Sequence, residues 1–229
     1  MVHKNTSFII SVKTTRAETP GYLSVIFERP RNFKYEAGDW MDLELTSADL
    51  RGGKTYSFSS SPTDQDLMIT FREGISPFKK ALAALKAGDE LRVVQYGNDY
   101  GFRLSDNRSS ILIAGGVGIA PFRSMIKEMA DRHDKNTVHL IYLHQTGVFI
   151  FQQELDEWSK ILPNLKITYI VTKDLKRKDR ERTLSNIISS HDQRFYIAGP
   201  EGMVADTQAF LIGTGVDKRN IKVDSFGGY

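Results

Sequence analysis

Apolar and polar residues alternate in short runs along the first half of the chain. Alternation with a period of two is typical of strands that bury one face, and turn residues such as Thr19-Pro20-Gly21 and Ala37-Gly38-Asp39 separate the runs. Strands at this spacing predict a small antiparallel barrel of the Greek-key type. The runs lie at 7–12, 22–28, 40–45, 67–71 and 90–94.

One helical pattern interrupts these strands. Phe78, Leu82 and Leu85 recur at helical spacing within residues 77–86. Ser76 stands directly before them, where its hydroxyl is suited to accept a hydrogen bond from the first helical turn. We therefore expect a short helix with Ser76 as its N-cap.

Beyond residue 105 the pattern changes to buried strands that alternate with helices. This order is typical of a parallel, doubly wound, Rossmann-like sheet. The polar segment 105–110 reads as a linker, so we expect a barrel domain at 1–104 and an α/β domain at 105–229. The strands are expected at 111–114, 138–143, 166–171, 194–198 and 220–223, and the helices near 121–133, 151–160, 183–190 and 201–212.

Composition excludes several classes of protein. The 229 residues carry a net charge of +3 and no cysteine, which rules out disulfides, cysteine-bound zinc and an iron–sulfur cluster within this chain. The five histidines show no metal-ligand spacing, and the small charge argues against a broad nucleic-acid-binding face. Apolar runs fall short of the roughly 20 residues of a membrane helix, and the first residues lack a signal-peptide core. We expect a cytoplasmic protein without a membrane span.

A glycine-rich turn follows the first strand of the second half. The sequence ILIAGGVGIAPFRSMIKEM passes from a strand into a helix, and such a turn directs unpaired N–H groups toward an anion. Gly115, Gly116 and Gly118 allow a ligand to approach the backbone closely. Pro121 occupies the place of the last glycine of a G-x-G-x-x-G motif, where its missing N–H costs nothing. A purely structural turn is the alternative.

A second turn of the same kind lies in FYIAGPEGMV, at residues 195–204. Here Gly199-Pro200 again ends a strand and begins a helix. Both turns lie at carboxyl ends of parallel strands, on the edge where such sheets bind ligands. The two turns together predict a nucleotide pocket.

Five motifs in this order resemble the ferredoxin–NADP reductase family of flavoenzymes, over nearly the whole chain. The resemblance implies that the barrel binds FAD, that the second domain binds NADPH or NADH, and that a hydride passes between nicotinamide and flavin N5. The motifs are Lys54-Thr55-Tyr56-Ser57, Gly74 with Ser76, residues 115–121, Gly199-Pro200-Glu201-Gly202-Met203 and Asp224-Ser225-Phe226-Gly227-Gly228-Tyr229.

The resemblance assigns roles on the flavin side. Tyr56 would lie against the isoalloxazine ring, and Ser57 would offer its hydroxyl near N5. Lys54 stands where the family usually has an arginine for the diphosphate, and a lysine supplies a point charge without a bidentate fork, so FMN stays an alternative to FAD. The remaining flavin contacts implied are Phe58, Ser59, Phe71, Gly74, Ile75 and Ser76.

The resemblance also assigns roles near the end of the chain. Tyr229 would cover the other face of the flavin and move aside for nicotinamide, and Asp224 stands where the family often has a proton-relaying glutamate. Ala198 replaces a cysteine that many relatives carry. The nucleotide contacts implied are Gly115, Gly116, Gly118, Ile119, Ala120, Pro121, Gly199, Pro200 and Met203.

The basic segment after Val171 bears on the choice of nicotinamide cofactor. In the family, basic side chains at this place meet the adenosine 2′-phosphate, so Lys173 with Arg182 would favour NADPH over NADH, and Thr172 is a further nucleotide contact that the resemblance implies. A solvated, charged loop without such a role is the alternative.

The resemblance predicts an NAD(P)H-dependent flavoprotein reductase. Because the chain has no cluster of its own, single electrons would pass to a separate acceptor, most plainly a ferredoxin or flavodoxin. The alternatives are an oxygenase reductase component, a flavin reductase acting on a small-molecule acceptor, and a non-catalytic nucleotide-binding subunit. Direction of electron flow and oligomeric state are left open by the sequence.

Overall fold

The computed structural model describes residues 2–4, 7–45, 53–99, 101–104, 108–188 and 190–227. The chain forms two compact units. The first holds the chain up to Arg103 together with Ala120–Asp131, and the second holds Leu104–Ile119 and Arg132–Gly228. A helical segment from the second half of the sequence therefore belongs by its contacts to the first unit. The domain boundary at 104/105 stays a prediction.

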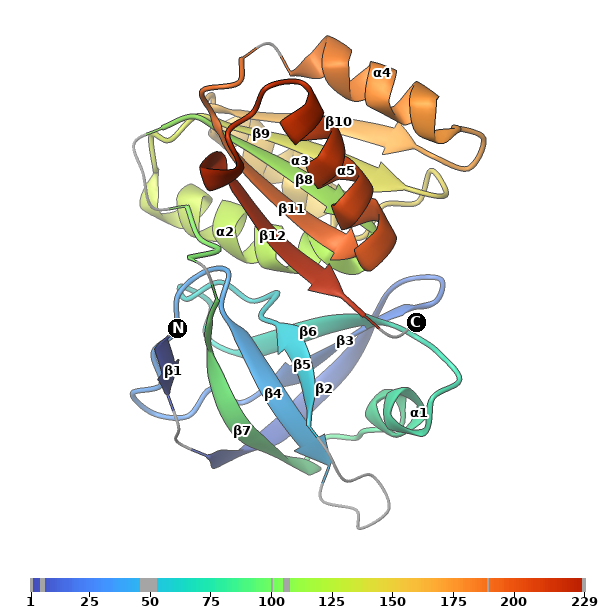
Figure 1. The fold of residues 1–229 in the computed structure, drawn as a ribbon. Coiled ribbons are helices and arrows are strands. Elements are labelled where there is room, and N and C mark those ends of the chain that lie inside the picture. The colour runs from blue at the N-terminus through green and yellow to red at the C-terminus, as the bar shows by residue number, and fades with distance from the viewer. Residues whose placement is uncertain are drawn as a thin grey trace. The chain divides into compact units, whose positions relative to one another are not determined.

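The first unit is an antiparallel barrel (Figure 1). Its strands follow the order β5-β4-β7-β2-β3-β6, and β1 pairs with β7. The path closes where Phe58, directly after β5, bridges to Ile69 of β6, so the barrel predicted from the sequence is confirmed. The strands are β1 (Val2–Lys4), β2 (Phe8–Thr19), β3 (Tyr22–Phe27), β4 (Trp40–Leu45), β5 (Lys54–Ser57), β6 (Leu67–Arg72) and β7 (Glu90–Asn98).

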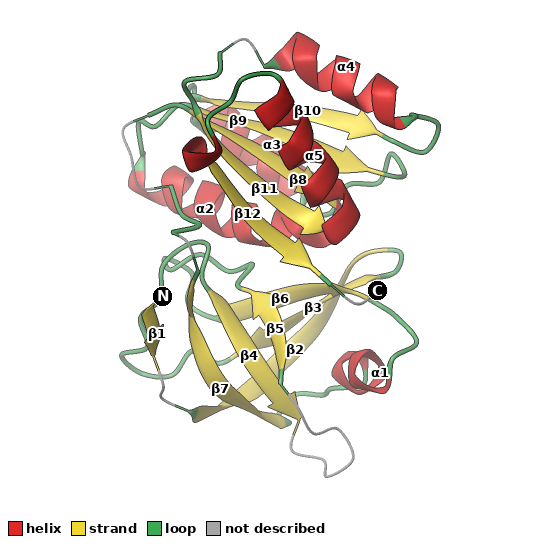
Figure 2. Cartoon of the chain, in the orientation of Figure 1, coloured by secondary structure: helices red, strands yellow, loops and turns green. Residues whose placement is uncertain are grey.

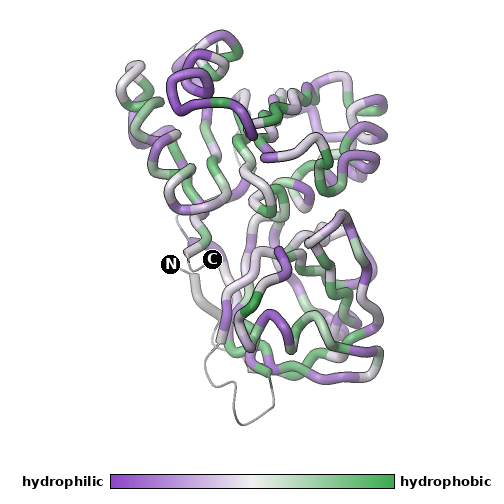
Figure 3. Tube along the Cα trace, turned by 90° about the vertical axis from the view of Figure 1, so that its right-hand side faces the viewer, coloured by the Kyte–Doolittle hydropathy of each residue, from purple (hydrophilic) through white to green (hydrophobic). Residues whose placement is uncertain are grey.

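Strand β2 runs seven residues beyond the stretch expected from its alternation. The extension KTTRAET is polar and mostly exposed, so its hydropathy gives no sign of a strand. It is held as a strand because β3 supplies backbone partners, from Thr14 opposite Ile26 to Thr19 opposite Tyr22. The hydropathy of each residue along the trace is shown in Figure 3.

The short helix α1 (Pro77–Ala83) has the predicted N-cap. The Ser76 hydroxyl accepts a hydrogen bond from the Lys79 N–H at 3.3 Å. Phe78 and Leu82 are buried in the barrel core, as their spacing indicates. The helix ends three residues earlier than expected.

The second unit contains a parallel sheet in the order β10-β9-β8-β11-β12 (Figure 2). Strand order therefore reverses between the adjacent strands β8 and β11. The strands are β8 (Ser110–Gly115), β9 (Val138–His144), β10 (Leu165–Val171), β11 (Arg194–Pro200) and β12 (Ile221–Phe226). The helical segments are η1 (Gly116–Gly118), α2 (Ile119–Arg132), α3 (Gln152–Ile161), α4 (Arg177–Ile187), α5 (Glu201–Gly213) and η2 (Lys218–Asn220).

Helices lie on both faces of this sheet. Ile170 shares a core with Leu184 of α4 and Leu211 of α5. The neighbouring Tyr169 points to the opposite face, where its hydroxyl donates to Asp156 of α3 at 2.7 Å. The predicted doubly wound arrangement is confirmed.

Helix α4 corrects the expectation of a loop over residues 172–182. The helix begins at Arg177, six residues before the predicted start, although RKDRER carries no apolar residue. Local polar contacts hold this turn: the Lys176 N–H donates to Asp179 at 3.3 Å, and Arg177 pairs with Glu181 at 2.8 Å. Hydrophobic periodicity does not register such contacts.

Across the described ranges, none of the helices has the length and apolarity needed to span a membrane. The same residues contain no group of three or more His, Cys, Asp or Glu side chains arranged to hold a metal ion.

Within the first unit, Arg123 joins helix α2 to the serine run after β5. Its side chain is 6% exposed, and its guanidinium donates to the Ser59 carbonyl oxygen at 2.7 Å. The Asp64 carboxylate lies 3.6 Å from the same nitrogen. A buried cation with these partners fixes the serine run and the helix to each other.

We expect Arg123→Met to lower the free energy of unfolding by about 2 kcal/mol, because the buried Ser59 carbonyl would lose its donor. The matched control is Lys127→Met on the same helix, which breaks a more exposed pair with Asp131 and should cost less than about 1 kcal/mol. Urea denaturation measures both. Equal losses for the two variants would contradict the assigned role of Arg123.

Candidate functional site

Tyr56 presents an aromatic ring held in one orientation by the barrel core. It lies on β5, is half-buried, and stacks on Phe78 with ring centroids 6.4 Å apart and planes 19° apart. The Phe71 ring meets it edge-on at 6.2 Å. Because both phenylalanines belong to the core, Tyr56 is a rigid platform on which a flat ligand can lie.

The serines after Tyr56 are buried, and three of them form part of the barrel's own hydrogen-bond network. The Ser59 hydroxyl lies 2.8 Å from the Thr70 hydroxyl and 3.1 Å from the Met68 carbonyl oxygen. Ser60 pairs with the Tyr35 hydroxyl at 2.8 Å, and the Ser61 N–H donates to Asp64 at 2.8 Å. The polar groups of these three serines are therefore used in hydrogen bonds that stabilise the barrel.

Ser57 is the serine nearest the platform, and its side chain is 6% exposed. Its neighbour Phe58 is fully buried and forms the bridge that closes the barrel. Three consecutive residues thus have three different roles: Tyr56 provides the aromatic surface, Ser57 is buried beside it in the chain, and Phe58 holds the strand in the barrel core.

The turn between β6 and α1 is open to solvent. Lys54 is exposed on β5, Gly74 is exposed in the turn, and Ile75 is 90% exposed. The Ser76 hydroxyl is used by the cap of α1, which makes its role in the fold clear while its role toward a ligand stays a prediction.

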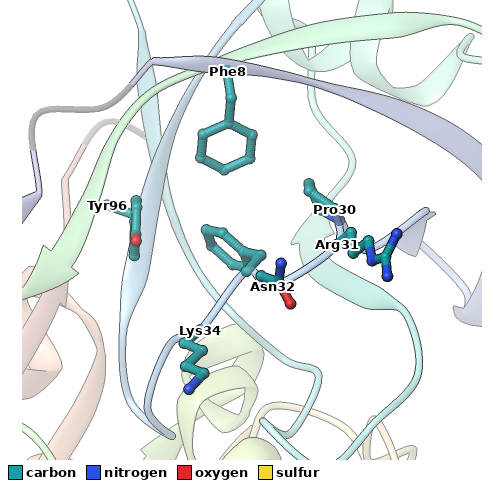
Figure 4. A pocket seen from close by; sticks show the side chains of 7 residues that line it. Phe8, Pro30, Arg31, Asn32, Lys34 and Tyr96 are labelled. Atoms are coloured by element: carbon teal, nitrogen blue, oxygen red, sulfur yellow. The ribbon is translucent and has the colours of Figure 1, made fainter.

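A separate groove in the first unit is built by other elements. It has a volume of about 360 Å³ and is lined by Phe8, Phe33 and Tyr96 with Arg31 and Lys34 at its rim (Figure 4). The Phe33 ring packs 5.1 Å from Phe8 and 4.8 Å from Tyr96. The aromatic wall is thus continuous with the barrel core, and no residue predicted for the site lies in this groove.

In the second unit, the two glycine turns pack against each other. They follow β8 and β11, which are adjacent at the reversal of strand order. A Cβ at Gly118 would overlap the Ala198 carbonyl oxygen and stand 2.5 Å from its carbonyl carbon. Glycine is required at 118 because backbone meets backbone there. The two turns that the sequence places on one edge of the sheet are therefore in direct contact, and the nucleotide pocket there stays a prediction.

Met203 covers this contact from helix α5. A Cβ at Gly115 would stand 2.5 Å from the Met203 methyl group, and one at Gly199 would overlap the same methyl. Gly199 has a φ of +153°, and a Cβ there would also come within 3.1 Å of the Gly115 carbonyl oxygen. Gly115, Gly199 and Met203 thus form one tightly packed cradle, in which an added side chain would have to displace the end of the Met203 side chain.

A side-chain hydrogen bond fixes the carbonyl group of Gly116. Gly116 has a φ of +54°, and its carbonyl oxygen accepts a hydrogen bond from the Tyr142 hydroxyl at 3.1 Å. Pro200 ends β11 at the head of α5, while Ile119, Ala120 and Pro121 are buried at the start of α2. Pro121 lies in the first turn of that helix, as predicted.

Asp224 lies beside the second turn. It is half-buried on β12, in register with Ala198 of β11, and Ser225 is in register with Gly199. A carboxylate is thereby placed one strand away from the glycine cradle. Tyr229 lies outside the described residues, so its assignment stays a prediction.

The predicted 2′-phosphate residues lie on two elements. The Thr172 N–H donates to the His144 carbonyl oxygen at 2.8 Å, and Lys173 is exposed in the loop that follows β10. Arg182 is exposed on helix α4 instead of in that loop. On the same helix, Arg177 pairs with Asp206 of α5 at 3.0 Å.

Sequence reasoning missed two residues that hold the site in place. Tyr142 reads as an ordinary strand residue, and nothing in its pattern reveals the hydrogen bond to Gly116. Arg123 carries a weak signal, since a charged residue stands among the apolar positions Phe122, Met125 and Ile126 of one helix. A lone charge among apolar neighbours indicates a buried partner.

In comparison with known proteins, the family model of the oxidoreductase NAD-binding domain matches residues 112–209. The reductase component 1 of terephthalate 1,2-dioxygenase from a Comamonas species is 24% identical over 206 residues. The match covers 84% of this chain and 60% of that relative, so the chain spans less than two thirds of the relative's length.

Solved structures share the fold. A ferredoxin NADP+ reductase from Neisseria gonorrhoeae with bound FAD and NADP has a TM-score of 0.78 at 20% identity, covering 96% of this chain and 98% of that one. A cytochrome P450 reductase from Amycolatopsis has a TM-score of 0.81 at 18% identity, covering 97% and 71%. The chain thus has the fold of a ferredoxin–NADP reductase. The residues matched by the NAD-binding domain model include both glycine turns.

In the reductase-like fold, Gly118→Ala should lower the free energy of unfolding by about 3 kcal/mol, because the new methyl must displace backbone. Gly213→Ala is the matched control: it lies in α5 with open space around it, and alanine there should stabilise by about 0.5 kcal/mol. Thermal and urea unfolding measure both. A neutral Gly118→Ala would mean that the two turns do not pack as described.

Proposed function

We propose that the protein is a flavin-dependent oxidoreductase that takes a hydride from NADPH or NADH and passes single electrons to a separate acceptor. The observation that carries this proposal is the cradle of Gly115, Gly118 and Gly199 at the reversal of strand order, where open parallel sheets bind dinucleotides. It lies within a matched NAD-binding domain.

Residues of the first unit fit a flavin. Tyr56 offers a flat surface that core packing keeps in one orientation, and the buried Ser57 follows it directly on β5. Flavin, when bound, supplies hydride acceptance and the release of electrons one at a time. The protein's own part is to hold the ring and to exclude water from it.

FAD is the flavin we propose, with FMN as the alternative. FAD and NADP are named in the Neisseria gonorrhoeae structure, which shares this fold over almost all of both chains. Lys173 and Arg182 favour NADPH, since both are exposed cations on the segment after β10.

The acceptor we propose is a separate carrier protein, a ferredoxin or flavodoxin, because no cysteine is present to hold a cluster. The terephthalate dioxygenase relative is a reductase component, which makes an oxygenase partner the second candidate. A small-molecule acceptor such as free flavin is the third. Such a reductase would act in the cytoplasm, where the NAD(P)H pool is found.

The visible absorbance of the purified protein tests this proposal directly. The purified protein should be yellow or take up added FAD in a one-to-one ratio, and NADPH or NADH added without oxygen should bleach it. The donor that bleaches faster at equal concentration names the physiological cofactor. A protein that stays colourless with both FAD and FMN would leave only a non-catalytic nucleotide-binding module.

Ser57→Ala tests the buried hydroxyl. We expect the rate of flavin reduction to fall about tenfold with FAD affinity unchanged, since one hydrogen bond made near the reacting atom is lost. Thr55→Ala is the matched control, because Thr55 is exposed and its hydroxyl donates to Asp42. Stopped-flow absorbance measures both. Equal rates in wild type and Ser57→Ala would remove Ser57 from the mechanism.

A further inference from the structure

The aromatic groove of the first unit is built on a tight turn of the chain. The turn covers residues 30–33, and the Phe33 N–H donates to the Pro30 carbonyl oxygen at 3.0 Å. Asn32 has a φ of +66°, a left-handed conformation that asparagine adopts more readily than most residues. Figure 4 shows the Phe8 ring pointing toward this turn. The turn therefore forms one side of the groove.

Arg29 holds this turn against a neighbouring loop. Its Nε and Nη2 donate to the Phe33 carbonyl oxygen at 3.1 and 2.9 Å. Its Nη1 donates to the carbonyl oxygens of Pro62 and Asp64 at 2.7 and 3.0 Å. All three guanidinium nitrogens are thus bonded to backbone, and the side of the groove is formed before any ligand arrives. A preformed surface loses little entropy on binding.

Two rings leave part of their surface uncovered in this groove. Phe8 and Phe33 are half-buried and pack with centroids 5.1 Å apart, and Tyr96 meets Phe8 edge-on at 6.1 Å. A single exposed apolar side chain is ordinary on a protein surface. Here the rings share one hollow of about 360 Å³, a volume within the range of roughly 300 to 1,000 Å³ of ligand pockets. The hollow therefore offers apolar surface that a flat ring can cover.

The rim of the groove carries positive charge. Arg31 and Lys34 are exposed, and none of the residues that line the groove is acidic. Within the described ranges, neither cation has an ion pair or a side-chain hydrogen bond. Glu36, the next acidic residue along the chain, is paired with Arg103. The two cations thus attract an anion to the hollow.

We propose that this groove binds a planar aromatic carboxylate. The ring of the ligand would cover the open parts of Phe8 and Phe33. Its carboxylate would pair with the planar fork of Arg31, while Lys34 supplies a second, less directional charge. The groove shares no residue with the flavin contacts proposed above, so the inference goes beyond the proposed function and does not depend on it.

Isothermal titration calorimetry of the full chain with naphthoate tests the proposal. The protein is titrated as purified and again with FAD in excess, which separates binding in the groove from binding at the flavin site. Naphthoate should bind equally in both titrations. Naphthylmethanol, which has the same ring without the charge, should bind about tenfold more weakly. Arg31→Gln should weaken naphthoate binding about tenfold and Lys34→Gln about threefold, with naphthylmethanol binding unchanged in both.

Lys86→Gln is the matched control, because Lys86 is an exposed cation of the same unit that does not line the groove. It should change naphthoate affinity less than twofold, and melting temperatures within a few degrees of wild type would show that each variant is folded. A wild-type protein that does not bind naphthoate overturns the proposal. Equal losses in Arg31→Gln and Lys86→Gln overturn it as well, since they would mean attraction by net charge alone. So does naphthoate binding that disappears when FAD is in excess.

Discussion

The contact between Gly118 and Ala198 is the constraint on which the second unit depends. Two backbone segments, one after β8 and one at the end of β11, meet with no space for a side chain between them. Parallel strands bring their carboxyl ends to one edge, yet they do not by themselves bring the following turns into contact. Glycine at 115, 118 and 199 makes the contact possible, and Met203 fills the space above it.

This packing changes how the glycines of the turn are interpreted. A glycine-rich turn is usually interpreted as space left for a phosphate. Here Gly118 is required first by the protein's own packing, because backbone meets backbone there. The Tyr142 hydroxyl fixes the Gly116 carbonyl, which orients the peptide groups of the turn. A rigid turn would lose little entropy on binding, so the residues that pack the two turns together would also suit the nucleotide binding proposed for them.

In the first unit, contacts between side chains, and not between backbone segments, hold the candidate site in a fixed arrangement. Tyr56 is oriented by Phe71 and Phe78, and the buried serines after it are tied to Thr70, Tyr35 and Asp64. Arg123 adds a cation to this network from α2. Polar groups buried in this way stabilise a fold only when each has a partner, and the network supplies those partners.

Hydrophobic alternation in the sequence predicted both sheets and the Ser76 cap, because burial of one face and local capping are recorded in neighbouring residues. It failed for the second half of β2 and the start of α4, where the chain is polar and the structure depends on strand pairing or on pairs such as Arg177 with Glu181. The motif around Tyr56 was visible in the sequence, whereas the contacts that orient its ring were not. Phe71 comes from β6 and Phe78 from α1, and the two rings meet Tyr56 only in the folded barrel.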